Sequence, residues 1–349
     1  MLVDGHQDIA FNVVNHRRDF LRAVAETRAA EGERAEEIAM LGLPDALAGG
    51  VGLVFGTLYV APASAAHLSG GKVYRTADEA HAQALEQLSA YRRLAGDPRV
   101  CLVARRAELA ALRAGWDGGQ PRLGIVLLME GADPIRTPSE AVDWYAAGVR
   151  IVGPAWGATR YCGGTGAPGP LTAEGRALMG AMHRAGLALD VSHMAEESFW
   201  EALELFDGPV LASHSNCRAL VPGPRDDRHL SDAMIRALMA RDGVVGVVLY
   251  NRFLDPEWTL VRGKQAVGLD AVVRQIDHVC QLAGDVHHVA VGSDFDGGFG
   301  SEAAPRELDS IADLGRIGEA LAGAGYREAD IDAVLGGNWL RALERVLPP

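Results

Sequence analysis

Short apolar runs recur along the chain, and each ends in a polar residue or a glycine before a segment with helical periodicity. A run that is apolar at nearly every position is typical of a parallel strand buried on both faces, so the alternation predicts βα units. There are eight such runs, at residues 2–9, 51–60, 123–129, 150–155, 187–191, 209–212, 244–249 and 288–292. Eight units in one uninterrupted series favour closure into a (β/α)8 TIM barrel, an α/β fold, over a doubly wound open sheet.

The segments between these runs carry the expected helices and give no sign of a domain boundary. Helix candidates, several with a Ser, Thr or Asp cap, lie at residues 77–95, 141–146, 173–185, 195–205, 231–240, 269–283 and 330–346. Because no repeat, low-complexity tract or linker is present, residues 1–349 are predicted to form a single catalytic domain. An excursion around residues 61–120, with an extra strand at 99–105, is expected between the second and third barrel strands.

The charge balance excludes several classes of partner. The 349 residues include 33 Lys and Arg against 46 Asp and Glu, for a formal net charge of -13, and no basic run is present. Such a chain repels phosphate backbones and anionic lipid, so no nucleic-acid or membrane partner is expected. Without an apolar segment of membrane-spanning length or a secretory leader, the protein is expected in the cytoplasm. The four cysteines lack CxxC spacing and are expected to be reduced thiols.

Residue types that bind metals stand where four of these strands end. His6 and Asp8 lie at the end of the first run, Glu130 follows the third, and His193 and His214 follow the fifth and sixth. The carboxyl ends of barrel strands meet at one rim, so these side chains are predicted to converge there. Five imidazole and carboxylate ligands suit two metal ions bridged by a carboxylate and a hydroxide. Zinc fits them better than magnesium or calcium, while manganese, cobalt and iron stay open. The structural alternatives are a salt bridge from Glu130 to a barrel-lining arginine and histidines satisfied at the rim.

Two aspartates, Asp294 and Asp296, follow the eighth run. A metal hydrolase needs an acid/base that takes a proton from the attacking water and passes it to the leaving group. Asp294, which is nearer to the strand, is the predicted proton carrier. Asp296 precedes Gly297 and Gly298 and is better explained as part of a turn.

Six motifs follow one another along the chain: DGHQD, MEGADPI, LDVSHM, ASHSNCRAL, GSDFDG and GGNWLRAL. In this order they resemble the membrane (renal) dipeptidase family of metallopeptidases, a branch of the amidohydrolase-like barrels. The resemblance implies a binuclear centre with two Zn2+ ions per chain. In it, His6 and Asp8 hold one ion, His193 and His214 hold the other, and Glu130 bridges them.

The resemblance also implies that Asp294 transfers the proton and that an arginine binds the substrate. The family's arginine stands in an Arg-Asn-hydrophobic-x-Asp pattern, which residues 228–232 match with His in place of Asn. The role is therefore carried to Arg228, with Arg225 as the fallback and a solvated surface arginine as the alternative. After the fourth strand the family has a histidine that bonds the substrate and the developing oxyanion, and here Trp156 aligns with it.

Indole donates one hydrogen bond and accepts none, so Trp156 either lines the pocket or packs beneath it. If it lines the pocket, another donor or another substrate is implied, since loss of one such donor costs about 10²–10³ in rate. The sequence offers three further donors, His183, His229 and Arg160. The glycine-rich segment 159–166 lacks the spacing of a phosphate-binding loop and is predicted to be a mobile rim loop, with Cys162 as a spectator thiol.

A small-molecule dipeptide is the substrate that this resemblance implies, bound by its amino group at the metal centre and by its carboxylate at the arginine. The expected activity is that of a metallo-dipeptidase that tolerates a D-residue at the C-terminal position, and family members are often homodimers. Two alternatives stay open. One is a related metal-dependent hydrolase of another small amide or lactone, and the other is a catalytically silent metal-binding barrel.

Overall fold

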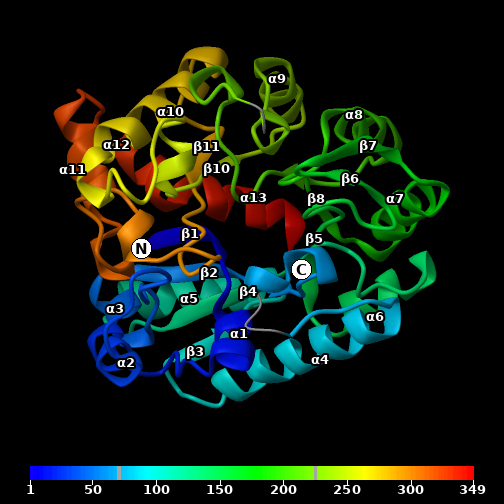
Figure 1. Cartoon of the computed structure of the whole chain (residues 1–349), viewed down its shortest axis with the longest axis horizontal. Coiled ribbons are helices and arrows are strands. Elements are labelled where there is room, and N and C mark those ends of the chain that lie inside the picture. The colour runs from blue at the N-terminus through cyan, green and yellow to red at the C-terminus, as the bar shows by residue number, and fades with distance from the viewer. Residues whose placement is uncertain (69–71, 224–225) are drawn as a thin grey trace.

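The computed structural model describes residues 1–68, 72–223 and 226–349, and a ring of parallel strands lies at its centre (Figure 1). The strands of the ring are, in chain order, β1 (Leu2–Gln7), β2 (Val51–Tyr59), β4 (Leu123–Glu130), β5 (Val149–Gly153), β8 (Ala188–Asp190), β9 (Val210–Leu211), β10 (Val245–Val247) and β11 (Val289–Val291). Hydrogen bonding is continuous from β1 to β9, and β10 pairs with β11. Parallel bridges from Ala212 to Val245 and from Gln7 to Phe295 join these two sheets on both sides. The ring is closed, and the predicted (β/α)8 barrel is confirmed.

The expected helices surround the strands, with boundaries close to prediction. Six of them match their candidates within one residue: α4 (Ala77–Leu94), α6 (Ala141–Ala146), α7 (Ala173–Ala185), α8 (Glu196–Leu205), α9 (Asp232–Ala240) and α10 (Leu269–Ala283). The side chains of Thr76, Thr172 and Ser231 cap α4, α7 and α9 by accepting a hydrogen bond from the third helical residue. The pattern did not predict α1 (Ile9–Phe11), α2 (Val24–Glu31), α3 (Leu43–Ala48), α5 (Arg106–Asp117) and α11 (Arg316–Gly323). Within the described ranges, no helix is long and apolar enough to cross a bilayer.

The segment predicted as a final helix is interrupted by a wider turn. α12 (Glu328–Asp332) and α13 (Asn338–Val346) are joined by a π-helical turn at Ala333–Gly337. A Cβ atom at Gly336 would lie 2.7 Å from the carbonyl oxygen of Met1, so the glycine lets this turn pack directly against the chain at β1.

The excursion between the second and third barrel strands contains α4, β3 (Val100–Leu102) and α5. β3 pairs in parallel with the first residues of β4, with Val100 opposite Leu123. β5 pairs with β4 only from Leu127 onward, so β3 occupies the part of this edge that β5 leaves free. The extra strand expected at 99–105 is therefore present outside the ring, while the single-domain organisation of residues 1–349 stays a prediction.

Trp339 of α13 packs inside the barrel together with inward-facing side chains of the strands. Its ring lies 4.9 Å from that of Phe55 on β2, and its indole nitrogen donates a 2.8 Å hydrogen bond to the carbonyl of Val291 on β11. A Cβ atom at Gly5 would lie 2.6 Å from this ring, so β1 has a glycine where the indole needs room. α13 thereby fills the interior between β1, β2 and β11.

The segment 159–166, predicted to be a mobile rim loop, forms part of a hairpin instead. β6 (Cys162–Gly164) pairs antiparallel with β7 (Ala167–Leu171). A Cβ atom at Gly163 would lie 2.4 Å from the nitrogen of Gly169, so glycine allows the two strands to approach closely. Burial raises the pKa of the Cys162 thiol to about 12, as expected for a spectator, and all four cysteines are free thiols.

Candidate metal centre

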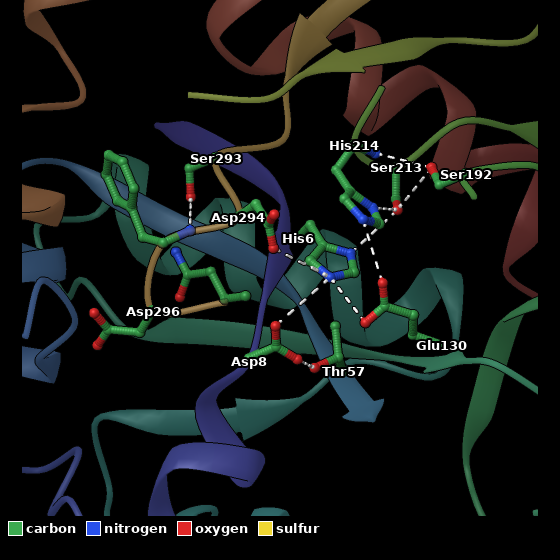
Figure 2. A network of polar contacts seen from close by, with 12 residues as sticks. His6, Asp8, Thr57, Glu130, Ser192, Ser213, His214, Ser293, Asp294 and Asp296 are labelled. Atoms are coloured by element: carbon green, nitrogen blue, oxygen red, sulfur yellow. Dashed lines mark hydrogen bonds and ion pairs between the residues drawn. The ribbon is translucent and has the colours of Figure 1, made fainter. Parts of the chain in front are cut away.

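Five candidate ligands converge at the carboxyl ends of the barrel strands. His6 lies in β1, Glu130 is the last residue of β4, and Asp8, His193 and His214 follow β1, β8 and β9 within three residues. All five are buried, with exposed fractions of 9% or less. Figure 2 shows His6, Asp8, Glu130 and His214 pointing toward one another. Glu130 faces three imidazoles and not the barrel-lining arginine of the structural alternative.

The carboxylate of Glu130 lies between two sets of these ligands. Its Oε1 atom is 3.1 Å from Nε2 of His193 and 3.3 Å from Nε2 of His214, and the two nitrogens are 2.9 Å apart. Donor atoms at about 2.0 Å from a tetrahedral zinc ion are about 3.3 Å from one another, so this triangle has the size of one ligand shell. On the other side, Oε2 of Glu130 is 3.5 Å from Nε2 of His6, which lies 4.0 Å from Oδ2 of Asp8.

The chemistry of these groups fits divalent cations. Nε2 of His6 is buried and has no hydrogen-bond partner among the described residues, and such an atom needs a ligand to offset its desolvation. Burial holds the pKa values of His193 and His214 well below the usual range, so both rings are neutral and can bind a metal. Burial raises the pKa of Glu130 to about 8, and burial with the charge of Glu130 raises the pKa of Asp8 to about 7. A cation would favour the ionised form of both carboxyls, and nitrogen and oxygen donors together fit zinc.

Neighbouring hydroxyl groups hold several of the candidate ligands. Thr57 of β2 donates a short hydrogen bond to Oδ1 of Asp8. The hydroxyl of Ser213 lies against Nδ1 of both His6 and His214, on the side of each ring that faces away from Glu130. These contacts limit the rotation of the ligand side chains.

Asp294 lies beside the cluster and faces the pocket. Its Oδ1 atom is 3.9 Å from Nε2 of His6, and its backbone nitrogen donates to the carbonyl of His6 at 3.3 Å. Its side chain keeps 13% exposure, more than that of any of the five candidate ligands. Burial raises its pKa well above the usual range, although the neighbouring His6 opposes this shift. The carboxyl group therefore holds a proton more readily than an exposed aspartate does.

Asp296 lies outside the pocket lining and anchors the loop between α2 and α3. Its carboxylate accepts the backbone N–H groups of Met40 at 2.9 Å and Leu41 at 3.2 Å, and it lies 3.2 Å from Nη1 of Arg18. Its backbone is left-handed, with φ of 61°, as its interpretation as a turn residue predicts. The structure thus separates the two aspartates into different environments.

Arg228 is buried at the pocket, which contradicts the alternative of a solvated surface arginine. Its exposed fraction is 3%, and its guanidinium group donates to the carbonyl of His214 at 2.9 Å and lies 5.2 Å from the ring centroid of Phe253. In the described structure its Nε atom has no partner, and Asp294 acts on it only through its charge. A buried guanidinium without a carboxylate partner suits an anionic group of a ligand. The fallback, Arg225, lies outside the described residues.

Trp156 lines the pocket and does not pack beneath it. Its ring lies 5.4 Å from the ring of Tyr59 and is stacked 6.0 Å from that of His193. The three further donors considered from the sequence are absent from the pocket lining in the described part of the chain: His183, His229 and Arg160.

Two groups of aromatic residues line a cavity of about 510 Å³, and of their six members sequence reasoning singled out only Trp156. The first aromatic wall is formed by Phe11, Tyr59 and Trp156, with neighbouring ring centroids 5.3 and 5.4 Å apart. The second aromatic wall is formed by Tyr250, Phe253 and Phe299, with neighbouring ring centroids 5.0 and 4.7 Å apart. The sequence offers only a weak signal for these walls, because Tyr59 is the only one of the six residues that is the last residue of a barrel strand.

Comparison with known proteins gives relatives along the whole length of the chain. The family model of the membrane dipeptidases (Peptidase family M19) matches residues 1–347. An uncharacterized protein in the pqqA 5′ region of Klebsiella pneumoniae is 37% identical over 272 residues, which cover 75% of this chain and 93% of that protein. Dipeptidase aclJ of Aspergillus oryzae is 32% identical over 175 residues, or 50% of this chain and 39% of that protein.

Solved structures agree with this assignment. A metallo peptidase from Rhodobacter sphaeroides, liganded with a phosphinate mimic of the dipeptide L-Ala-D-Ala, is 26% identical with a TM-score of 0.79, and the match covers 99% of both chains. Dipeptidase AC, a metallo peptidase of family M19, is 25% identical with a TM-score of 0.80, over 100% of this chain and 99% of that one. The chain belongs to the membrane dipeptidase family of metallopeptidases.

Proposed function

We propose that this metallo-dipeptidase uses two zinc ions to cleave the amide bond of a dipeptide whose amino and carboxylate ends are bound by different groups of one pocket. The observation that carries the proposal is that Glu130, Asp294 and Arg228 all line the same cavity of about 510 Å³. A cavity of this size encloses a small ligand but not a long peptide. Substrate length is therefore limited by the cavity itself.

Charge complementarity orients the substrate in this cavity. Arg228 binds the carboxylate of the dipeptide, because it is a buried guanidinium to which no carboxylate of the described residues is bonded. The amino group of the dipeptide lies at the other end of the cavity, at the metal centre, where the carboxylates of Asp8 and Asp294 offer negative charge. With both ends bound, the scissile amide lies between Arg228 and Glu130.

The metal centre and Asp294 have different roles in the proposed reaction: Lewis-acid chemistry for the metal centre and proton transfer for Asp294. Zinc ions held by the five candidate ligands would supply Lewis-acid chemistry, acidifying a water molecule and polarising the scissile carbonyl. Asp294 takes the proton of the attacking water on its carboxylate and gives it to the leaving amine. The raised pKa of Asp294 supports this role, because a carrier must hold the proton between the two steps.

The two aromatic walls define the preferred side chains of the substrate. Apart from Arg228, His193 and the carboxylates, the lining of the cavity offers mostly aromatic rings. Apolar and aromatic side chains gain burial there, whereas charged side chains lose hydration without a partner. A D-residue at the C-terminal position is included in the proposal, because the Rhodobacter relative is liganded with a mimic of L-Ala-D-Ala.

The proposal is tested with a panel of L,L- and L,D-dipeptides and metal-stripped protein restored with zinc. We expect zinc-dependent release of free amino acids and binding of two zinc ions per chain. Dipeptides of Leu and Phe should exceed those of Asp and Lys in kcat/KM by about 10-fold or more. Equal rates for both groups would refute the role of the aromatic walls.

Two other outcomes would replace the proposal. If the zinc-loaded protein cleaves lactams, lactones or N-acyl amino acids but no dipeptide, it is the related hydrolase, and Trp156 is the feature to examine. If the zinc-loaded protein shows no turnover above the background that Asp294→Asn also shows, the barrel is a catalytically silent metal-binding protein.

A further inference from the structure

The hydroxyl group of Ser213 lies beside the imidazole rings of His6 and His214 and contacts both (Figure 2). Its hydroxyl oxygen is 3.2 Å from Nδ1 of His6 and 2.8 Å from Nδ1 of His214, and the two ring centroids are 3.6 Å apart. Both rings present Nδ1 to Ser213 and Nε2 to Glu130. One hydroxyl group therefore contacts two candidate ligands on the side opposite to the metal centre.

The direction of these hydrogen bonds follows from Asp190. The Ser213 hydroxyl donates its hydrogen to Oδ2 of Asp190 at 2.5 Å. The other oxygen, Oδ1, accepts the backbone N–H groups of Ser192 and Ser213, both at 2.9 Å, which fixes the orientation of the carboxylate. A hydroxyl has a single hydrogen, so toward the imidazoles Ser213 acts only as an acceptor. Nδ1 of His6 and Nδ1 of His214 must therefore each carry a hydrogen.

We propose that Asp190 and Ser213 are positioning residues that hold His6 and His214 in the tautomer that binds metal. A neutral imidazole with its hydrogen on Nδ1 has its lone pair on Nε2, the atom that faces the metal centre. In the proposed function these two histidines belong to different zinc ions. The inference rests on that function, and it makes one serine responsible for ligands of both ions.

His193 provides an internal reference for this inference. Its Nδ1 atom lies 3.0 Å from the hydroxyl of Thr165, and its ring hydrogen-bonds the backbone of Trp156. These partners belong to the segment around the hairpin β6–β7 and not to the Asp190–Ser213 pair. A substitution in that pair should leave the tautomer of His193 unchanged.

Two substitutions test the pair in different ways. Ser213→Ala deletes the acceptor that both Nδ1 atoms contact. Asp190→Asn keeps the shape of the side chain, and the two backbone N–H groups keep Oδ1 in place, so the new amide group donates to Ser213. The serine hydrogen then turns toward one imidazole, whose Nδ1 must accept it, and that ring carries its own hydrogen on Nε2, where it blocks metal binding.

Ser293→Ala is the matched control. Ser293 is bonded to Asp4 in the same way, through its backbone nitrogen at 2.7 Å and its hydroxyl at 2.5 Å. In the described structure its hydroxyl contacts no imidazole ring. The control removes an equivalent buried bond between serine and aspartate without changing the partners of His6 or His214.

The first readout is zinc affinity, measured for the full-length proteins by competition with a chromophoric chelator. Loss of a hydrogen-bond partner of a ligating histidine reduces metal affinity by about 10–100-fold. We expect losses of this size for both ions in Ser213→Ala and for at least one ion in Asp190→Asn, with little change in Ser293→Ala. Parental affinity in both test variants would overturn the inference.

The second readout is the tautomer of each ring in metal-free protein labelled with 15N-histidine, from long-range 1H–15N correlation spectra. His6 and His214 should carry the hydrogen on Nδ1 in the parent and in Ser293→Ala, and one or both should shift to Nε2 in the test variants. Unchanged tautomers there would refute the role of Ser213. This readout needs no turnover, so a parent protein that binds no zinc would defeat the proposed function while the spectra still decide on Ser213.

Discussion

His193 and Asp294 have left-handed backbone conformations, with φ of 67° and 61°, although neither is a glycine. Such a conformation costs about 1–3 kcal/mol in a residue with a side chain, and the surrounding structure has to supply it. Strain of this kind is found where a side chain is placed against the local preference of the chain. It fits the roles proposed for both residues, as a metal ligand and as the proton carrier.

Arg228 is expected to determine how strongly the enzyme prefers a dipeptide with a free carboxylate over the corresponding C-terminal amide. Arg228→Gln removes the charge that faces the substrate carboxylate, and a hydrogen bond to a charged group contributes about 1.5–3 kcal/mol. The kcat/KM for dipeptides should fall by about 10–150-fold, while the low activity on the amides changes little. Steady-state kinetics on both substrates measure this, with the exposed Arg236→Gln as control. If the variant still prefers the free carboxylate by the parental factor, another group binds it.

His229 is expected to make the protein less stable in mild acid. Burial, with a contribution from the charge of Arg228, lowers its pKa to about 3, whereas histidine in an unfolded chain titrates near 6.5. Between these values the unfolded state binds more protons, so the free energy of unfolding falls by up to about 1.4 kcal/mol per pH unit as pH decreases below about 6.5. Above that pH the residue adds no pH dependence.

The variant His229→Asn should therefore lose less stability than the parent between pH 7 and pH 5, by about 2 kcal/mol. Urea unfolding at both pH values measures it, after chelation so that release of metal in acid does not contribute. His287→Asn, at an exposed position, should behave as the parent does. Identical pH dependence in His229→Asn and the parent would show that this histidine is protonated in the folded state.

At the scale of the elements, β10 and the residue after β11 both pack against the carbonyl oxygen of Ser213, which follows β9. A Cβ atom at Gly246 of β10 would lie 2.0 Å from this oxygen, and one at Gly292, directly after β11, would lie 1.9 Å from it. Both contacts are to backbone, so no change of rotamer can relieve them. The two glycines leave room for this carbonyl group, so the chain after β9 can lie alongside β10 with Ser213 and His214 at the candidate site.

Gly292→Ala should lower the free energy of unfolding by at least about 3 kcal/mol, the upper end of the range for overpacked cores, because the backbone has to move. Gly323→Ala, at the last residue of α11 with no neighbouring atom within 4 Å, should be neutral or stabilising by up to about 1 kcal/mol. Urea unfolding followed by circular dichroism compares the two. Equal unfolding midpoints would contradict the close contact between Gly292 and the carbonyl of Ser213.

At the scale of the whole molecule, side chains help to close the barrel where its two sheets meet. β1 and the residues after β11 share few main-chain bonds, among them that from Asp294 to the carbonyl of His6. The buried carboxylate of Asp4 adds two more, from the backbone nitrogen and the hydroxyl of Ser293, and is oriented within β1 by a 2.8 Å hydrogen bond from the amide of Gln7. Asp4 is thus part of the seam of the barrel, which is the junction between β1 and the residues after β11.

Asp4→Ala should leave two buried donors of Ser293, its backbone N–H and its hydroxyl hydrogen, without their acceptor, at a cost of about 1–3 kcal/mol for each. We expect the free energy of unfolding to fall by about 2–6 kcal/mol in urea titrations. Asp330→Ala, which removes a partly exposed carboxylate paired with the exposed Arg327, serves as control and should show no comparable change. A parental midpoint in Asp4→Ala would mean that the main-chain bonds alone close the seam.

The parts of this molecule that were predictable from sequence depend on local pattern. Apolar runs identified all eight barrel strands, and the residue types at their ends identified the side chains that converge around Glu130. The burial of Arg228 and the aromatic walls were not predictable, because they depend on how segments distant in the sequence pack over the rim. Phe11, for example, lies in α1 and Phe253 in the segment after β10, and neither position belongs to a repeating pattern.

The position of the seam affects when the metal centre can form during synthesis on the ribosome. β1 is made before the other seven barrel strands, yet it closes the ring only against the residues after β11, and Trp339 of α13 enters the interior later still. The side chains of His6 and Asp8 therefore stay exposed to solvent until Asp294 has been synthesised. A metal ion therefore cannot be enclosed by these candidate ligands before β11 and Asp294 have been synthesised, so the order of the strands along the chain sets the earliest time at which the centre can be loaded.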